Sequence, residues 1–310
     1  MRSASLRSRT LRLVCTLWLI VTAAFVCAYA LPGDPARMIL GQRATPESIA
    51  AFRRSTGLDQ SVGVQYVRFV QRALRLELGD SLVQRRPVLS LLRERGLQTV
   101  TLLLVATALL ATFGLIVPVL LQLLNQRVPR EIYAGFWTLL AVAPPYVLSI
   151  VALLLVAVRL ALVPVTFDPA RASAWVLPGV VLAAYPIAVT IRLLNEQIER
   201  ARQAPYVTAA RALGYPERDV LLRFAVPNAL TPAMAALANG LAFFVTGSFF
   251  VEVVFGISGW GTLAYEAVRN KDISVLVGVT IIFGAGICVI SALLQLALLA
   301  LDPRVAAGHD

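Results

Sequence analysis

Three carboxylates near the C-terminal end of the sequence are the residues best placed for chemistry with a polar solute. Glu252 ends a long apolar run, and Glu266 and Asp272 lie in the short polar stretch that follows it. An acidic side chain beside an apolar run is costly unless it faces water or a partner group. We therefore predict Glu252 as the candidate residue lining a solute pathway, and Glu266 and Asp272 as exposed loop charges.

Other residue types that commonly perform catalysis are scarce. His309, the only histidine, lies beside the C-terminal residue. Lys271, the only lysine, follows Asn270 and not the glycine that a phosphate-binding loop requires. The three cysteines each lie inside an apolar run, with no pair at metal or redox spacing. The sequence therefore predicts that the chain alone is not an enzyme, with no catalytic residue, no metal site and no cofactor.

The composition is that of a membrane protein. Apolar residues make up 58% of the 310 positions, 15% are charged, and the mean hydropathy is +0.77. A soluble domain of this length needs a more polar surface. The net charge of +11 comes from residues spread between apolar runs, which favours anchoring at membrane edges over nucleic-acid binding.

Six uncharged runs are each long enough for a helix to cross a bilayer. They are Leu13–Gly33, Gly96–Gln126, Ile132–Val158, Ala172–Ile191, Phe224–Val251 and Ile273–Leu301. The first run is longer than the apolar core of a usual signal peptide, so we predict that it is a retained span. The predicted fold class is all-α: a polytopic membrane protein with six transmembrane helices and an external helical cap between spans 1 and 2.

The basic residues predict the orientation of these spans. With the N-terminus inside, the cytoplasmic segments hold most of the short-loop arginines, and the short outer loops hold only Arg159, Arg171, Arg269 and Lys271. Both termini are therefore predicted to be cytoplasmic. We expect residues 1–310 to form one transmembrane domain, with the first span in 1–33, an external segment in 34–95, and a five-span core in 96–301 that contains a cytoplasmic loop at 192–223.

The external segment carries helix signals. Thr45-Pro46-Glu47 supplies an N-cap, a proline at the first helical position and an early acid. Apolar residues recur at near-helical spacing through Gln65–Leu78, and Pro87–Arg95 reads as the start of another helix. We predict an outer cap of short helices.

The cytoplasmic loop contains two further helix signals. Pro205 can begin a helix that continues to Gly214, which is a good residue to end it, and Pro216 can begin a second helix. The small side chains of the first helix would let its backbone approach the cleft of a partner protein. From the residues alone, a helix lying on the membrane surface is an equal alternative.

This loop resembles the "EAA" coupling loop of bacterial ABC importer permeases. Thr208-Ala209-Ala210 stands where that pattern has Glu-Ala-Ala, Gly214 follows at the same spacing, and Phe224-Ala225-Val226-Pro227 stands nine residues further on. Thr208 departs from the acidic first position of the pattern.

Further segments resemble the dipeptide/oligopeptide/nickel branch of these permeases, and they follow in order along nearly the whole chain. They are Leu31-Pro32-Gly33-Asp34-Pro35, Gly57-Leu58-Asp59-Gln60 with Gln65-Tyr66, Gly79-x-Ser81 with Arg86-Pro87-Val88, Gly247-Ser248 with Val251-Glu252, Val254-Phe255-Gly256, Gly259-x-Gly261, and Leu301-Asp302-Pro303-Arg304-Val305. Each is weak alone, but the ordered set is specific. Gln295 departs from an acidic residue that the family often carries late in the last span.

The resemblance implies a multi-pass permease of the bacterial cytoplasmic (inner) membrane. It implies a homologous second permease as partner in a heterodimer, two cytoplasmic ATPase subunits, and an external solute-binding protein that delivers short peptides. The residues expected to couple the pathway to an ATPase are Tyr206, Thr208, Ala209, Ala210, Arg211, Gly214 and Pro227.

Two kinds of alternative remain. Within the family, the cargo would instead be nickel or a metal chelate. Outside it, the chain would be a secondary transporter or a membrane scaffold. Secondary transporters usually place ionisable residues at the bilayer midplane, and the uncharged runs here contain none.

The predicted topology is testable with reporter fusions. A reporter fused after Asp310 should report a cytoplasmic location, and one inserted within Leu31–Arg95 should report an external location, because the short-loop arginines stay inside. A C-terminal reporter found outside the cytoplasmic membrane would contradict this topology.

Overall fold

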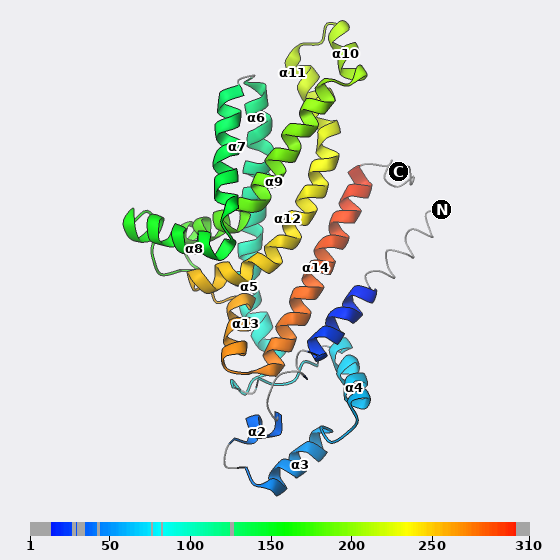
Figure 1. Cartoon of the computed structure of the whole chain (residues 1–310), viewed down its shortest axis with the longest axis vertical. Coiled ribbons are helices and arrows are strands. Elements are labelled where there is room, and N and C mark those ends of the chain that lie inside the picture. The colour runs from blue at the N-terminus through cyan, green and yellow to red at the C-terminus, as the bar shows by residue number, and fades with distance from the viewer. Residues whose placement is uncertain are drawn as a thin grey trace, which may run out of the picture. The chain divides into compact units, whose positions relative to one another are not determined.

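The computed structural model describes residues 14–26, 29, 35–41, 44–75, 77–81, 83–124 and 127–301 (Figure 1). Within these residues every named element is a helix, and the only β feature is an isolated bridge between Asp80 and Pro87. The predicted all-α class is confirmed. The chain forms two compact units, residues 1–96 with 263–288, and residues 97–262 with 289–310.

The first unit contains the predicted outer helices. An apolar helix spans Val14–Val26 and is followed by α2 (Pro35–Leu40), α3 (Pro46–Thr56) and α4 (Val62–Leu74). Thr45 caps α3 as predicted, since its hydroxyl accepts a hydrogen bond from the Ser48 N–H at 3.2 Å. Next, α5 (Val88–Leu109) begins directly after Pro87, as the sequence indicates.

Asp272 is buried in this unit, so the prediction that it is an exposed loop charge was wrong. It is 3% exposed, and its carboxylate accepts hydrogen bonds from the Ser81 hydroxyl at 2.5 Å and the Val83 N–H at 3.3 Å. It also accepts from the Val275 N–H at 3.3 Å, in the first turn of α14 (Ile273–Leu301). The error arose because Ser81 and Val83 lie far away in the sequence. Glu266, by contrast, is partly exposed.

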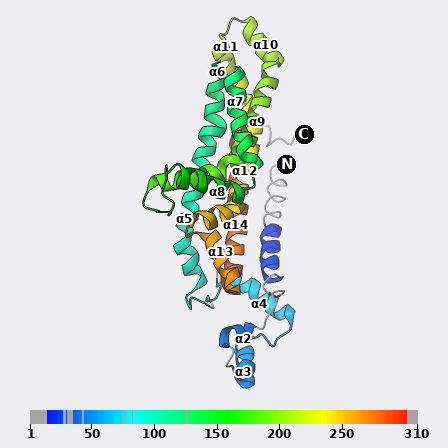
Figure 2. The same ribbon diagram turned by 60° about the vertical axis from the view of Figure 1, so that its left-hand side comes forward.

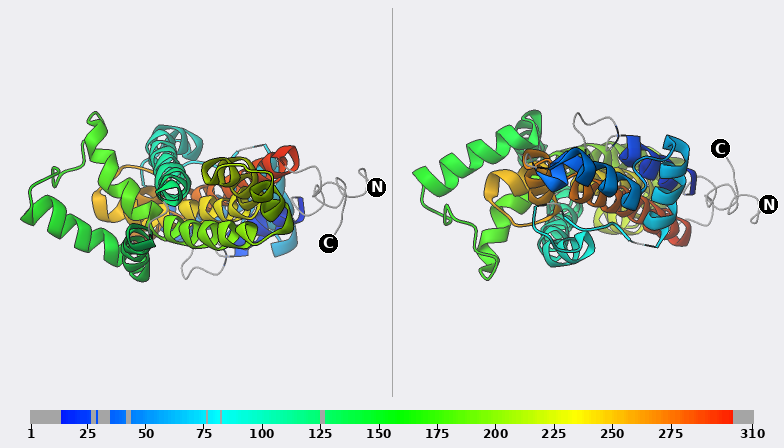
Figure 3. Two further views of the ribbon diagram at one scale, coloured as in Figure 1. Left: turned by 90° about the horizontal axis from the view of Figure 1, so that it is seen from above. Right: turned by 90° about the horizontal axis from the view of Figure 1, so that it is seen from below.

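The second unit is organised around α9 (Val176–Arg202). Figures 1 and 2 show α9 running side by side with α12 (Val226–Phe255), and the left-hand view of Figure 3 shows this pair end-on. The fully buried Leu182, Ile187 and Phe244 lie in the core that these helices share. Close approach is made possible by small residues of α12: a Cβ on Gly247 would lie 2.9 Å from Leu182 Cδ1.

The remaining elements of the second unit cover this pair. The π-helical turn η1 (Leu110–Ile116) continues α5 into α6 (Val117–Leu123), and α7 (Arg127–Val142) packs on α9. After α8 (Pro145–Ala152) come the π-helical turn η2 (Leu153–Arg159) and the 3₁₀ turn η3 (Ala172–Trp175), which leads into α9.

Among the described residues, three helices are long and apolar enough to cross a membrane: Val88–Leu123, Ala172–Arg202 and Ile273–Ala292. Two bent pairs raise this number to five if each pair is one span. The helix Val14–Val26 is shorter, and much of the rest of the predicted first span lies outside the described residues. The predicted count of six spans therefore stays a prediction.

One predicted span is not a continuous helix. The run Ile132–Val158 breaks between α7 and α8, and the axes of its two halves differ by 106°. Pro144 and Pro145 stand at the break, where Pro144 has an extended backbone with ψ of 147°. Proline has no N–H to donate and disfavours helical geometry in the residue before it, so two prolines in a row end α7.

The burial of Asp272 generates a stability prediction. Replacing Asp272 with Ala removes the acceptor for three donors, and a buried donor left without a partner costs about 1–3 kcal/mol. We expect a lower thermal unfolding midpoint for D272A in detergent. E131A, which changes an exposed carboxylate of α7, is the control and should leave the midpoint unchanged. Equal midpoints for the two variants would contradict a structural role of Asp272.

Candidate functional site

The loop that the sequence predicts to be cytoplasmic forms a helical segment between α9 and α12. It consists of α10 (Pro205–Ala212), the single turn α11 (Glu217–Asp219) and the π-helical turn η4 (Val220–Ala225), which runs directly into α12. Figure 1 shows α10 and α11 together at one end of the α9–α12 pair. The predicted helix starts at Pro205 and Pro216 are confirmed, although the second helix is only one turn before the π-helical turn.

The loop has a small core of its own. Val207 and Ala210 of α10 pack against Val220, and all three are buried, with Phe224 against them. The Tyr215 ring lies edge-on to Phe224 with ring centroids 5.4 Å apart, and the Tyr215 N–H donates to the Ala210 carbonyl at 3.2 Å. These contacts hold α10 on η4, and thereby on the start of α12.

This core places the predicted coupling residues on two different faces. Ala210 is 3% exposed and packs into the loop's own core with Val207 and Val220, and its role in coupling stays a prediction. The other predicted side chains are exposed: Tyr206, Thr208, Ala209, Arg211 and Pro227. Leu213, which is 78% exposed, lies beside them and was missed by the sequence analysis. Its signal was a large apolar residue directly before the helix-ending glycine.

Arg211 and Glu217 form an ion pair across the turn that joins α10 to α11. Arg211 Nε donates to Glu217 Oε1 at 2.7 Å, and an Nη donates to Oε2 at 3.3 Å. The hydrogen bond from Arg211 lowers the pKa of Glu217, and the same bond raises the pKa of Arg211. Both side chains are more than a third exposed, so solvent screening keeps the contribution to stability small. Because the pKa of Glu217 is lowered on folding, this contribution is present at neutral pH and is lost in acid.

Gly214 ends α10 in the left-handed region, with φ of 84°. A Cβ added there would meet no atom within 4 Å, so space does not explain the glycine. The backbone conformation does, because a residue with a Cβ adopts it at a cost of roughly 1–2 kcal/mol.

The second compact unit of the chain has another feature, the buried carboxylate of Glu252 near the C-terminal end of α12. Its side chain is 0% exposed. Oε1 accepts from the Thr99 hydroxyl at 2.8 Å, and Oε2 accepts from the N–H groups of Gly261 at 2.6 Å and Thr262 at 3.3 Å. The Thr99 Oγ1 in turn accepts from the Trp260 N–H at 2.8 Å. All donors that this carboxylate needs are thus supplied by the protein.

The backbone donors belong to the first turn of α13 (Trp260–Arg269), so Glu252 acts as its N-cap from outside the helix. Gly256 ends α12 with φ of 70°, and the chain turns by 72° into α13. Glycine is required on both sides of the contact. A Cβ on Gly259 would clash with the Glu252 carboxylate and the Thr99 hydroxyl, and one on Gly261 would lie 2.6 Å from the Phe249 Cα.

Glu252 therefore fixes the bend between α12 and α13, and in this structure its carboxylate faces protein donors. Its assignment as a residue of the solute pathway stays a prediction. Across the described residues, no group of three or more His, Cys, Asp or Glu side chains is placed to hold a metal ion.

The family of the chain follows from comparison with known proteins. Residues 114–307 match the family described as binding-protein-dependent transport system inner membrane component, and residues 4–103 match the N-terminal family of the same membrane components. The chain belongs to this family and is a permease subunit of an ABC importer, a multi-pass inner membrane protein. Such subunits are non-catalytic, and a separate ATPase hydrolyses the ATP.

Two relatives show how far the similarity extends. The glutathione transport system permease protein GsiC of Salmonella paratyphi A is 28% identical over 300 residues, which cover 96% of this chain and 97% of the relative. The protein of the same name from Escherichia coli K12 is 27% identical with the same coverage.

We call the hydrogen bonds from Thr99, Gly261 and Thr262 to the Glu252 carboxylate the Glu252 clamp. Weakening this clamp should lower stability in graded steps. Replacing Glu252 with Leu leaves the Thr99 hydroxyl and two backbone N–H groups without an acceptor, at about 1–3 kcal/mol for each buried group. Replacing it with Gln keeps one oxygen acceptor. We expect thermal midpoints in the order wild type, E252Q, E252L.

The control for this series is E199Q, because Glu199 is an exposed carboxylate of α9. An E252L protein that is as stable as E199Q would contradict the clamp.

Proposed function

We propose that this chain forms half of the pathway through which the importer moves short peptides, and that α10 couples the pathway to a partner ATPase. The relatives support the cargo class, since each is named as a glutathione transport permease and glutathione is a short peptide. A second, homologous permease would form the other half. Two ATPase subunits on the cytoplasmic side would receive the coupling helices, and an external binding protein would deliver the peptide.

The observation that carries the coupling role is the two-faced construction of α10. Val207 and Ala210 fix one face to η4, while Tyr206, Ala209 and Leu213 remain exposed on the other. An exposed apolar surface beside polar residues is typical of a protein–protein contact. Because η4 is continuous with α12, a partner that moves α10 would move the start of α12 with it.

The central test separates the two faces of α10. A209R adds bulk and charge to the exposed face, so it should fold and reach the membrane normally, yet lose co-purification of the ATPase and uptake of glutathione. A210R places the same side chain in the loop's core and should lower the amount of folded protein. A170R, at an exposed position in a loop between α8 and α9, is the matched control and should behave as wild type.

A second variant tests the turn at the end of α10. G214V introduces a branched side chain at a left-handed position and should reduce coupling by shifting α10, although the side chain itself has free space. If A209R and G214V reach the membrane at normal levels and transport at wild-type rates, α10 only lies on the membrane surface and the coupling proposal fails.

A further inference from the structure

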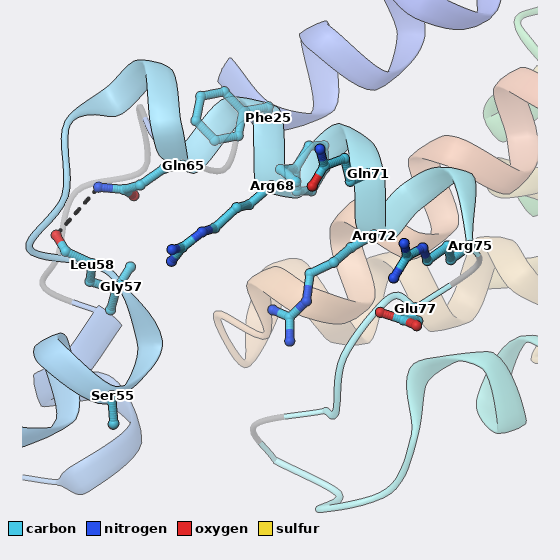
Figure 4. A pocket seen from close by; sticks show the side chains of 11 residues that line it. Phe25, Ser55, Gly57, Leu58, Gln65, Arg68, Gln71, Arg72, Arg75 and Glu77 are labelled. Carbon is cyan, nitrogen blue, oxygen red and sulfur yellow. Dashed lines mark hydrogen bonds between the residues drawn. The ribbon is translucent and has the colours of Figure 1, made fainter.

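A cleft in the first unit has no role in the coupling loop or in the Glu252 clamp. It has a volume of about 610 Å³ and lies between α4, the turn that follows α3, and the helix Val14–Val26 (Figure 4). Cavities of this volume are typical of small-molecule sites in proteins. The cleft is therefore large enough for a tripeptide.

One wall of the cleft is an arginine-rich face of α4. Arg68, Arg72 and Arg75 follow at spacings of four and three residues, which places them on one side of the helix, and Figure 4 shows them extending from α4. Among the described residues, none of these three guanidinium groups has a hydrogen-bonding or ion-pair partner. Glu77 is the one carboxylate in the lining, so the cleft carries an excess of positive charge.

This arrangement is unfavourable for α4 by itself, because like charges at these spacings repel and destabilise a helix. An anion bound in the cleft would remove that repulsion. The planar guanidinium groups suit a carboxylate in particular, since arginine can donate two parallel hydrogen bonds to it.

The opposite wall is held in a defined position. The Gln65 amide donates to the Gln60 carbonyl at 2.8 Å and to the Leu58 carbonyl at 3.3 Å, the bond drawn in Figure 4. Gly57 has φ of 73°, a backbone conformation that favours glycine, and Arg68 Nη1 would lie 2.5 Å from a Cβ added there. Phe25 and Phe69 both line the cleft, and their ring centroids lie 5.4 Å apart.

A more apolar cleft of about 310 Å³ shares six lining residues with the first: Phe25, Leu58, Gln65, Phe69, Arg72 and Glu77. It extends to Ile273 and Val277 at the start of α14, which belongs to the same unit. The combined cleft thus has a basic end and an apolar end.

We propose that this cleft binds a short anionic peptide, with its carboxylate groups on Arg68, Arg72 and Arg75 and an apolar side chain between Phe69 and Val277. The inference rests on the proposed function, in which the cargo is a short peptide and this segment is external. The cleft would hold cargo at the permease before it enters the pathway. The concave shape and the mixed lining favour a small ligand over a flat contact with a folded partner.

Lipid phosphate is the competing anion. Val64, Val67 and Leu74 are exposed on α4 next to the arginine face, an arrangement that also suits a helix lying at a membrane surface. The two ligands differ in what they require. A peptide site needs the cleft and the guanidinium groups together, whereas headgroup binding needs only the positive charge.

The test uses the full chain in nanodiscs of zwitterionic phosphatidylcholine. Binding of radiolabelled glutathione, a tripeptide with two carboxylates, is measured by equilibrium dialysis for wild type, R68Q/R72Q and R54Q. Arg54 is an exposed arginine of α3 outside the lining, so R54Q is the matched control. We expect R68Q/R72Q to bind glutathione at least roughly tenfold more weakly than wild type, and R54Q to bind it as wild type does. We expect wild type not to bind the diethyl ester of glutathione.

Three outcomes would overturn the inference. The first is that wild type and R68Q/R72Q bind glutathione equally, and the second is that wild type binds glutathione and its ester equally. The third is that R68Q/R72Q weakens only the binding of the protein to phosphatidylglycerol vesicles, which would assign the arginines to lipid. Failure here is distinguishable from failure of the proposed function. Wild-type glutathione uptake by the assembled importer with no binding in the cleft would remove only this inference, and arginine-dependent binding without any uptake would remove only the transport proposal.

Discussion

A carboxylate inside an apolar helical bundle has to find its hydrogen-bond donors within the protein, and this requirement shapes the C-terminal half of the second unit. Glu252 meets it by accepting from Thr99 and from the first N–H groups of α13. The same bonds satisfy a helix end that would otherwise leave its donors unpaired in a low-dielectric region. One interaction therefore serves both partners, and it sets where α12 ends and how the chain turns. Gly259 and Gly261 lie where a Cβ would clash with this arrangement, and Gly256 supplies the left-handed backbone that ends α12.

Asp272 repeats this solution in the first unit. Its carboxylate lies at the start of α14 and accepts a backbone N–H there, while Ser81 and Val83 bring the outer segment against it. A contact between residues so far apart in sequence ties the segment predicted to be external to the start of α14. Both buried acids thus act as caps on the positive end of a following helix, and each is satisfied by donors from a distant part of the chain.

The loop of α10, α11 and η4 is stabilised in two ways. Val207 and Ala210 of α10 pack with Val220 and the partly buried Phe224, while Leu221 and Ala225 of η4 join a core with α9 and the start of α12. The Arg211–Glu217 pair on the surface adds little. The arginine face of α4 differs again, because its like charges are not balanced within the described residues.

The sequence by itself determined the all-α membrane class and the helix starts at Pro46, Pro205 and Pro216. It also placed the loop of α10, α11 and η4 between two long helices. These features follow from the length of apolar runs, from prolines and from capping residues, all of which act locally. Only the tertiary structure decided which faces of these helices are covered. It turned Ala210 inward, although its neighbour Ala209 has the same side chain. It buried Asp272, and it bent the run Ile132–Val158 at two prolines. Burial depends on what packs against a residue, and the partners of Glu252 and Asp272 come from segments that no local pattern joins to them.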